Sequence, residues 1–216
     1  METRLVSITK PEIEGIHNAE NLIVYCARVS NPENQINIET APKLIRFLID
    51  HKHWSPFEMV NVCFEIKTSR AIAAQILRHR SFSFQEFSQR YSEVTELEPV
   101  ELRYKANKNR QSSSNIVENK HLNREVEKHL KRSLELYDTL IDRGVAKETA
   151  RMILPLTTET TLYMSGTLRS WIHWTEIRCK ENTQKEHREI AESIKKRLKV
   201  EFPNVFEALS IPEMGV

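Results

Sequence analysis

Residues 78–90 carry the side chains best suited to chemistry. They read Arg-His-Arg-Ser-Phe-Ser-Phe-Gln-Glu-Phe-Ser-Gln-Arg and hold three arginines, one histidine and three serines beside a single acid. Arginine is permanently charged and presents a planar fork of N–H donors, which suits it to phosphates and to the polar edges of rings. The segment is therefore a candidate anion site.

A plainer interpretation of the same residues is structural. Arg78 and Arg80 could simply close a helix, because a cation near a helix C-terminus gains about 0.3–1 kcal/mol from the dipole. This explains one or two arginines. It does not explain why Gln75, Arg78 and His79 share one side of a helical wheel. On the same wheel Arg80 falls on the apolar side, so the spacing favours the anion site.

Glycine is too sparse for the usual phosphate-binding loops. The chain has four glycines, and no two lie close together: Gly15, Gly144, Gly166 and Gly215. Neither a dinucleotide-binding fingerprint nor a P-loop can be built from them. If this protein holds a nucleotide, side chains must hold it.

Composition bounds the class of protein. The 216 residues include 32 basic and 30 acidic side chains, which is not the strongly basic balance of a duplex-binding domain. Nucleic-acid binding through residues 78–90 and a basic loop at 105–110 stays an alternative. Cys26, Cys63 and Cys179 form no CxxC pair and are expected to be reduced thiols, at least two of them buried. With no signal-like or membrane-spanning run, we expect a soluble, intracellular, cytoplasmic protein that binds no membrane.

Hydrophobic periodicity predicts helices around a small sheet. Alternation in residues 60–67 and the pattern of residues 3–8 predict strands. Helical spacing predicts helices in the following places: after Asn18, with Leu22, Tyr25, Cys26 and Val29; from Thr40, with Pro42 in the first turn; from 69 to 80; from Leu122 to Ile141, closed by Gly144; around 160–178; and around 183–200.

Two segments between these elements are expected to be irregular or extended. Ser88 and Arg90 would point the same way if the chain there is extended. Residues 105–115 are polar and unpatterned, which predicts a loop. We expect residues 1–216 to form a single domain of α/β (α+β-like) class, a small central sheet flanked by long helices.

The arginine segment resembles the signature of the flavin-dependent thymidylate synthases, R-H-R-x-x-S-x-N-E-x-S-x-R. Seven of its eight fixed letters agree, and Gln85 stands at the asparagine position. Three further stretches resemble the family. They are His53-Trp-Ser55-Pro-Phe-Glu58, with Met59 where a histidine is usual; Arg151-Met-Ile-Leu-Pro-Leu; and Leu168-Arg169-Ser170 with His173 and Arg178. Asn182-Thr-Gln184 stands where many members have His-Ala-Gln.

The resemblance implies an enzyme, a methyltransferase that reductively methylates dUMP to dTMP. In this family 5,10-methylenetetrahydrofolate donates the carbon, FAD carries the hydride and NADPH reduces the flavin. The family fold is α/β, and its members are homotetramers with active sites at subunit interfaces. The classical thymidylate synthases use a cysteine within a Pro-Cys motif, and none of the three cysteines here follows a proline.

The resemblance also implies residue roles. The positions that match FAD contacts are Ser55, Arg78, His79, Arg80, Glu86, Thr167, Arg169 and His173. The positions that match dUMP contacts are Gln75, Arg78, Glu86, Ser88, Gln89, Arg90, Arg151 and Arg178. Arg178 matches the arginine that polarises the uracil ring, where a guanidinium stabilises developing negative charge. Ser88 is the less favoured candidate for a nucleophile.

Histidine offers one competing chemistry. His51 and His53 form an H-x-H pair, and with Glu58 they could serve a metal-dependent nucleotide hydrolase. A pair lacks further ligands, so no metal is expected, and His53 is instead given a contact with folate or flavin. The remaining histidines are placed on polar helical faces without a role: His17, His121, His129 and His187. The loop at 105–110 is either a solvated loop or a flap over the nucleotide and folate.

Overall fold

A four-stranded antiparallel sheet forms the centre of the chain. The computed structural model describes residues 1–94, 96–107 and 112–210. The strands lie in the order β1 (Glu2–Ile8), β2 (Asn61–Ser69), β6 (Glu159–Thr167) and β3 (Ser83–Glu86). The long central strands pair from Asn61 opposite Thr167 to Ser69 opposite Glu159. The mixed α/β class expected from the sequence is confirmed.

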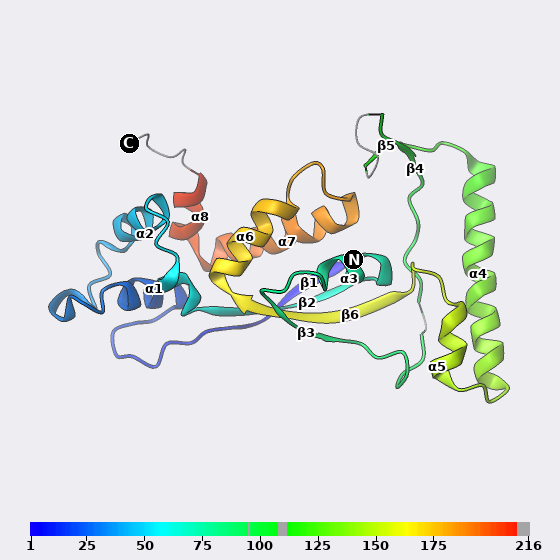
Figure 1. Cartoon of the computed structure of the whole chain (residues 1–216), viewed down its shortest axis with the longest axis horizontal. Coiled ribbons are helices and arrows are strands. Elements are labelled where there is room, and N and C mark those ends of the chain that lie inside the picture. The colour runs from blue at the N-terminus through cyan, green and yellow to red at the C-terminus, as the bar shows by residue number, and fades with distance from the viewer. Residues whose placement is uncertain (95, 108–111, 211–216) are drawn as a thin grey trace.

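One face of the sheet is buried and the other is not. Val62, Phe64 and Ile66 alternate toward the core, as their spacing predicted. Helices α6 (Leu168–Arg178) and α7 (Lys185–Glu201) cover that face, as Figure 1 shows. The indole N–H of Trp171 on α6 donates to the Val62 carbonyl at 3.0 Å, which ties the helix to the sheet.

Three helices gather at one end of the sheet: α1 (Ala19–Ala27), α2 (Ala41–Asp50) and α8 (Pro203–Ser210). Asn18 caps α1 by accepting from the Asn21 N–H at 2.8 Å, as expected. The helical spacing of Leu22, Tyr25, Cys26 and Val29 did not identify the buried face of α1. Ile23 and Val24 are buried, whereas Val29 lies beyond the end of the helix and is 70% exposed.

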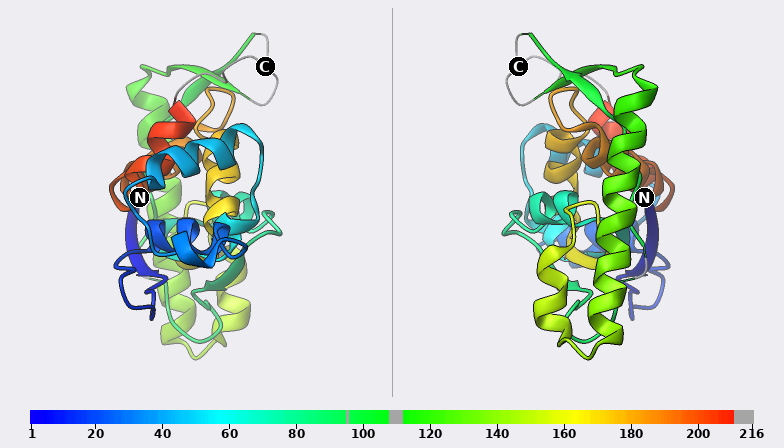
Figure 2. Two further views of the ribbon diagram at one scale, coloured as in Figure 1. Left: turned by 90° about the vertical axis from the view of Figure 1, so that its left-hand side faces the viewer. Right: turned by 90° about the vertical axis from the view of Figure 1, so that its right-hand side faces the viewer.

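The opposite end is more open. There the long helix α4 (Lys120–Asp142) and the short α5 (Lys147–Ala150) stand beyond the sheet, and a hairpin of β4 (Arg103–Lys105) and β5 (Ser113–Ile116) projects from it (Figures 1 and 2). Gly144 closes α4 with φ +79°, as expected. Tyr137 is the one buried residue of α4.

Several sequence-based expectations need correction. The helix expected over 69–80 is α3 (Arg70–Ile76), which ends four residues early. The stretch 160–178 is not one helix, because its first part is the central strand β6. Residues 105–115 hold most of the β4–β5 hairpin, and 108–111 lie outside the described residues. The three cysteines are free but only partly buried, so the expected burial of two is not met.

Gly166 fixes how the arginine segment meets the sheet. A Cβ at this position would lie 2.5 Å from Cδ1 of Phe82, because the phenyl ring occupies that space. Phe82 also packs against Trp171, with ring centroids 4.7 Å apart. The segment that follows α3 is therefore anchored to the sheet by the ring of Phe82, which lies within that segment.

Of the helices that the structure describes, none combines the length and apolar composition needed to cross a bilayer.

Candidate active site

The Arg78-His79-Arg80 motif lies in a turn, not on a helix. After α3 ends, the His79 N–H donates to the Ile76 carbonyl at 3.1 Å, and the Phe82 N–H donates to the His79 carbonyl at 3.3 Å. Arg78 and Arg80 are exposed in this turn. The wheel that placed Arg80 on an apolar side therefore does not apply.

His79 turns inward and contacts Arg178. The Arg178 Nε–H donates to His79 Nε2 at 2.9 Å, which requires a neutral imidazole with its proton on Nδ1. Burial and the Arg178 guanidinium lower the pKa of His79 from 6.5 to about 4, with smaller contributions from His173 and Arg78. Because neutral His79 accepts this bond, Arg178 is held in one place near neutral pH.

Gln75 joins the same region through α7. Its amide donates to the Gln184 Oε1 at 2.7 Å, and its Oε1 lies 3.3 Å from His187 Nδ1. The sequence placed His187 on a polar face without a role, and that was wrong: the side chain is fully buried. Burial, with Arg178 and His79 nearby, lowers the pKa of His187 to about 4.

Glu86 makes its contacts within the protein, with residues of α3 and β6. Its carboxylate pairs with Arg70 at 2.8 Å and accepts from the Thr160 hydroxyl at 3.1 Å. Arg70 also donates to the Phe87 carbonyl at 2.8 Å, so this pair holds β3 against β6 and α3. The structure thus gives Glu86 a positioning contact alongside the ligand role that the resemblance implies.

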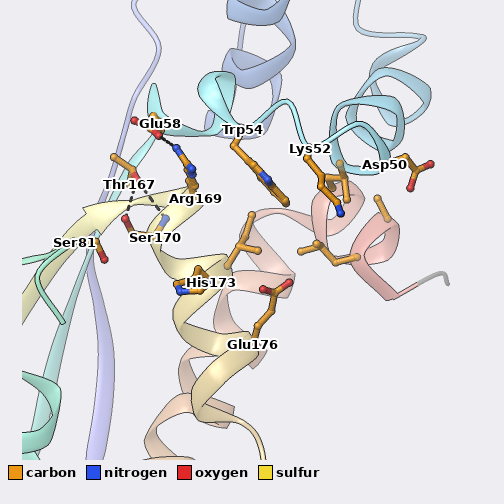
Figure 3. Close-up of a pocket in the computed structure, with 14 residues that line it drawn as sticks. Asp50, Lys52, Trp54, Glu58, Ser81, Thr167, Arg169, Ser170, His173 and Glu176 are labelled. Carbon is orange, nitrogen blue, oxygen red and sulfur yellow. Dashed lines mark hydrogen bonds and ion pairs between the residues drawn. The ribbon is translucent and has the colours of Figure 1, made fainter. Parts of the chain in front are cut away.

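A cavity of about 880 Å³ lies between α6, α2 and the turn η2 (Ser55–Glu58). Figure 3 shows Thr167, Arg169 and His173 on one side of it and Trp54 with Lys52 on another. These first three are expected flavin contacts that the structure brings together. Arg169 pairs with Glu58, and Thr167 caps α6 by accepting from the Ser170 N–H at 3.4 Å.

The rim of this cavity holds a strained residue that sequence reasoning missed. Lys52 has φ 58°, a left-handed conformation that favours glycine and that costs other residues about 1–3 kcal/mol. It follows α2 directly and precedes Trp54, whose ring packs on Phe57 at 5.4 Å. No sequence signal marked it, since lysine in a short turn is common. Ser55 and His53 lie in the same turn without lining the cavity.

Ser88 and Arg90 line a smaller cavity of about 390 Å³ with Tyr91 and Lys147. Residues 88–91 form a turn and not the expected extended chain, because the Tyr91 N–H donates to the Ser88 carbonyl at 3.1 Å. Arg90 pairs with the Glu148 carboxylate at 3.3 Å.

Two more expected nucleotide contacts lie near this cavity. The Arg151 Nε–H donates to the backbone carbonyl of Glu148 at 3.4 Å, a contact within its own segment of the chain, and Arg151 does not line the cavity. Gln89 is buried and Ser88 is exposed. The expected dUMP contacts therefore form two groups. Gln75, Arg78 and Arg178 lie around His79 and His187, whereas Ser88 and Arg90 lie beside α5, which Arg151 follows in the chain.

The histidine pair shows a different arrangement from a metal site. His51 stacks on Phe47 with centroids 4.0 Å apart, and His53 lies edge-on to the same ring at 5.9 Å. Glu58, the further ligand that the hydrolase alternative required, pairs with Arg169 instead. Within residues 1–94, 96–107 and 112–210, no group of three or more His, Cys, Asp or Glu side chains is placed to hold a metal ion.

Comparison with known proteins identifies the family. Residues 12–204 match the family described as thymidylate synthase complementing protein. A probable flavin-dependent thymidylate synthase of Paramecium bursaria Chlorella virus 1 is 52% identical over 213 residues, covering 97% of this chain and 99% of the viral protein. The flavin-dependent thymidylate synthase of Synechocystis is 51% identical over 216 residues, with the same coverage. The chain belongs to the flavin-dependent thymidylate synthase family. The expectation of an enzyme that uses a flavin is thereby confirmed.

A solved structure shares the fold. The UMP/dUMP methylase PolB from Streptomyces cacaoi, crystallised with 5-Br dUMP, superposes with a TM-score of 0.78 and covers 97% of this chain and 94% of its own. At 24% identity this likeness supports the arrangement of helices around the sheet.

Proposed function

We propose that this enzyme converts dUMP to dTMP, with 5,10-methylenetetrahydrofolate as carbon donor, FAD as hydride carrier and NADPH as reductant. The supporting observation is the Arg178–His79 pair, which holds a cation beside exposed Arg78 at the centre of the family motif. Relatives at half identity over nearly the whole chain carry the same activity in their names.

The 880 Å³ cavity is suited to the flavin cofactor. Its volume falls at the upper end of the range of about 300–1,000 Å³ that ligand pockets occupy. Its lining mixes an indole, hydroxyls and the cations Arg169 and Lys52 with three carboxylates, Asp50, Glu58 and Glu176. A pyrophosphate would meet the two cations and would compete with Glu58 for Arg169. Thr167, Arg169 and His173 would hold the cofactor here, and Ser55, the first residue of η2, would contact it from outside the lining. When bound, the flavin supplies the hydride.

Arg78, His79, Arg80 and Glu86 complete the proposed flavin set from the turn after α3 and from β3. Arg78 and Arg80 are exposed, which leaves their guanidinium groups available to phosphates. His79 would act from its neutral form. His53, beside the cavity, is proposed to contact the folate.

Arg178 is the proposed catalytic residue. Its guanidinium stays charged near neutral pH, although burial and nearby Arg78 lower its pKa, because the ordinary pKa of arginine lies far above neutrality. A fixed cation at the O2/N3 edge of uracil stabilises negative charge on the ring and makes C6 a better hydride acceptor. Two possible bases, Lys147 and Glu148, line the cavity with Ser88, but Lys147 pairs with Glu93 and Glu148 with Arg90, so a nucleophilic role for Ser88 is less favoured.

The phosphate of dUMP suits the second group of residues. Arg90 pairs with the Glu148 carboxylate and Arg151 donates to the Glu148 backbone carbonyl, so a dianionic phosphate would compete with that carboxylate for Arg90. Ser88 and Gln89 precede Arg90 in this second group. Gln75 and Arg78 belong to the first group, and Glu86 would contact the nucleotide from β3. A complete nucleotide site would draw on both.

A homotetramer would bring such groups together across subunits. α4 leaves Leu122 and Leu136 at 45% and 40% exposed, an apolar surface that a second copy of the chain could cover. We propose that active sites form at these subunit interfaces.

The decisive experiment is a turnover assay with dUMP, 5,10-methylenetetrahydrofolate and NADPH, with FAD added and withheld. We expect a yellow protein that absorbs at about 450 nm and that forms dTMP only when FAD is present. Arg178→Ala should lower turnover by at least about 100-fold, the usual cost of losing one stabilising donor, while keeping the flavin bound. Arg197→Ala, an exposed arginine on α7 that pairs with Glu201, is the matched control and should leave turnover unchanged.

Near-normal turnover of Arg178→Ala would contradict the role given to Arg178. A colourless protein that binds oligonucleotides with steep salt dependence would instead favour the nucleic-acid alternative.

A further inference from the structure

A fully buried histidine links three helices behind the proposed nucleotide site. His187, in the first turn of α7, lies 3.3 Å from the Gln75 Oε1 at the end of α3. Its ring also neighbours Trp174 on α6, with centroids 5.8 Å apart, and His79, at 6.4 Å. No part of the proposed reaction accounts for a polar ring at this depth.

Hydrogen-bonding capacity assigns one tautomer to this ring. An amide oxygen only accepts, so the His187 Nδ1 must carry the proton that meets the Gln75 Oε1. The Nε2 is then a bare acceptor, and it has no hydrogen-bond partner among the described residues. The charged and titratable neighbours, Arg178 and His79, oppose a second proton. The ring is a neutral, single-direction donor.

A chain of hydrogen bonds that begins at Glu186 decides which way the Gln75 amide faces, because a carboxylate can only accept. The oxygen and nitrogen of a glutamine amide have nearly the same shape, so packing alone does not distinguish them. With His187 donating, the oxygen faces the core, and the Nε2 donates outward to the Gln184 Oε1 at 2.7 Å. Gln184 in turn donates to Glu186 at 3.0 Å, which fixes its own oxygen toward Gln75.

We infer that His187 is a positioning residue, which together with Gln184 locks the Gln75 amide. Gln184 takes one Nε2 proton of Gln75 and leaves the other for the substrate nucleotide. This rests on the proposed function, in which Gln75 contacts dUMP. The recognised group is then an acceptor oxygen of the nucleotide. An apolar residue at 187 would leave the Gln75 Oε1 without its donor, so that the amide is held at its Nε2 end alone.

Calorimetric titration of dUMP into the flavin-loaded protein tests this inference. Losing one neutral hydrogen bond should weaken dUMP binding about 3- to 10-fold in His187→Leu. His187→Asn should stay within about twofold of the wild type, because its amide N–H lies near the position of Nδ1. In a Gln75→Ala background, His187→Leu should have no further effect on dUMP affinity.

Ile190→Ala is the matched control, one turn along α7, 2% exposed and without a hydrogen bond to make. It should lower the melting temperature without changing dUMP affinity. If His187→Leu does not fold, His187→Gln replaces it. The longer amide reaches toward the position of Nε2, so this variant should weaken dUMP binding where His187→Asn does not.

The outcomes separate this inference from the proposed function. Equal loss of affinity with and without Gln75, or equal loss in His187→Asn and His187→Leu, would overturn the positioning role while dUMP binding by the wild type stands. A wild-type protein that gives neither dUMP binding nor dTMP would overturn the proposed function and this inference together.

Discussion

The sheet body and helix α4 bury their apolar side chains to very different degrees. Trp171, Trp174 and Phe64 in the body are at most 1% exposed. In α4, whose 23 residues make it the longest described helix, Tyr137 alone is buried. The body can therefore hold side chains such as Arg178 and Gln75 in fixed positions, since their neighbours cannot move without opening a dense core.

α4 is held by weaker means. Asn119 caps it by accepting from the His121 and Leu122 N–H groups at 3.1 Å, and Tyr137 meets the Val94 N–H at 3.3 Å. Exposed pairs such as Lys128 with Glu125 contribute only about 0.2–0.5 kcal/mol each. Tertiary packing supplies most of the stabilisation of a helix, and within this chain α4 has only a small cluster in which Tyr137 packs with Val94 and Ala150.

Removing Trp171 should give the largest effect and would break the body's side of this contrast. Trp171→Ala deletes a fully buried indole that packs on Phe64 and Phe82 and donates to the Val62 carbonyl. We expect the free energy of unfolding to fall by about 3–5 kcal/mol, measured by urea denaturation. A loss below about 1 kcal/mol would mean that the core under α6 is not tightly packed.

The second-largest effect should come from acid, which should lower the free energy of unfolding of the sheet and the helices packed on it. His79 and His187 have pKa values of about 4 in the folded protein, against an ordinary value of 6.5, because of burial and the nearby Arg178. Between these values the unfolded chain binds more protons than the folded one. Their contribution is therefore complete above about pH 6.5 and is lost as the pH falls toward about 4.

Urea midpoints across that range would measure this loss. The exposed His121 and His129 of α4 provide the comparison. Replacing both with glutamine should leave the pH dependence unchanged, whereas His79→Asn and His187→Asn should flatten it. If replacing His121 and His129 removed the pH dependence, the acid sensitivity would belong to α4 and not to His79 and His187.

A charge placed on α4 should have the smallest effect on unfolding and would sharpen the contrast most. Leu136 is 40% exposed, so Leu136→Glu should change the free energy of unfolding by about 0.5 kcal/mol or less. It should instead shift the proposed homotetramer toward smaller species in sedimentation experiments. Leu162→Glu, at a fully buried position of β6, is the matched control and should prevent folding.

Local patterns predicted those elements that carry a clear period or cap. The alternation at Val62, Phe64 and Ile66 gave β2, and Asn18, Pro42 and Gly144 marked helix ends. β6 was missed because it runs into α6 at Thr167 with no loop between them, and Gly166 near the end of the strand was not read as the break between the two elements. Reading the two as one helix hid the strand that joins β2 to β3.

The candidate site was predicted by residue type better than by position. The family motif marked His79 and Arg178, and these side chains do meet. His187 was overlooked because Lys185, Glu186 and Arg188 surround it in sequence and suggest a solvated face. Its burial comes from α3 and α6 packing on α7, which no local pattern encodes.

The close approach of Phe82 to Gly166 also limits how this sequence can change. Any larger residue at 166 would displace the Phe82 ring, and any smaller residue at 82 would leave a cavity above β6. Randomising the two codons together should therefore return only combinations of nearly constant total volume. A substitution at either position alone would not be tolerated. The two positions should therefore vary together among descendants of this chain.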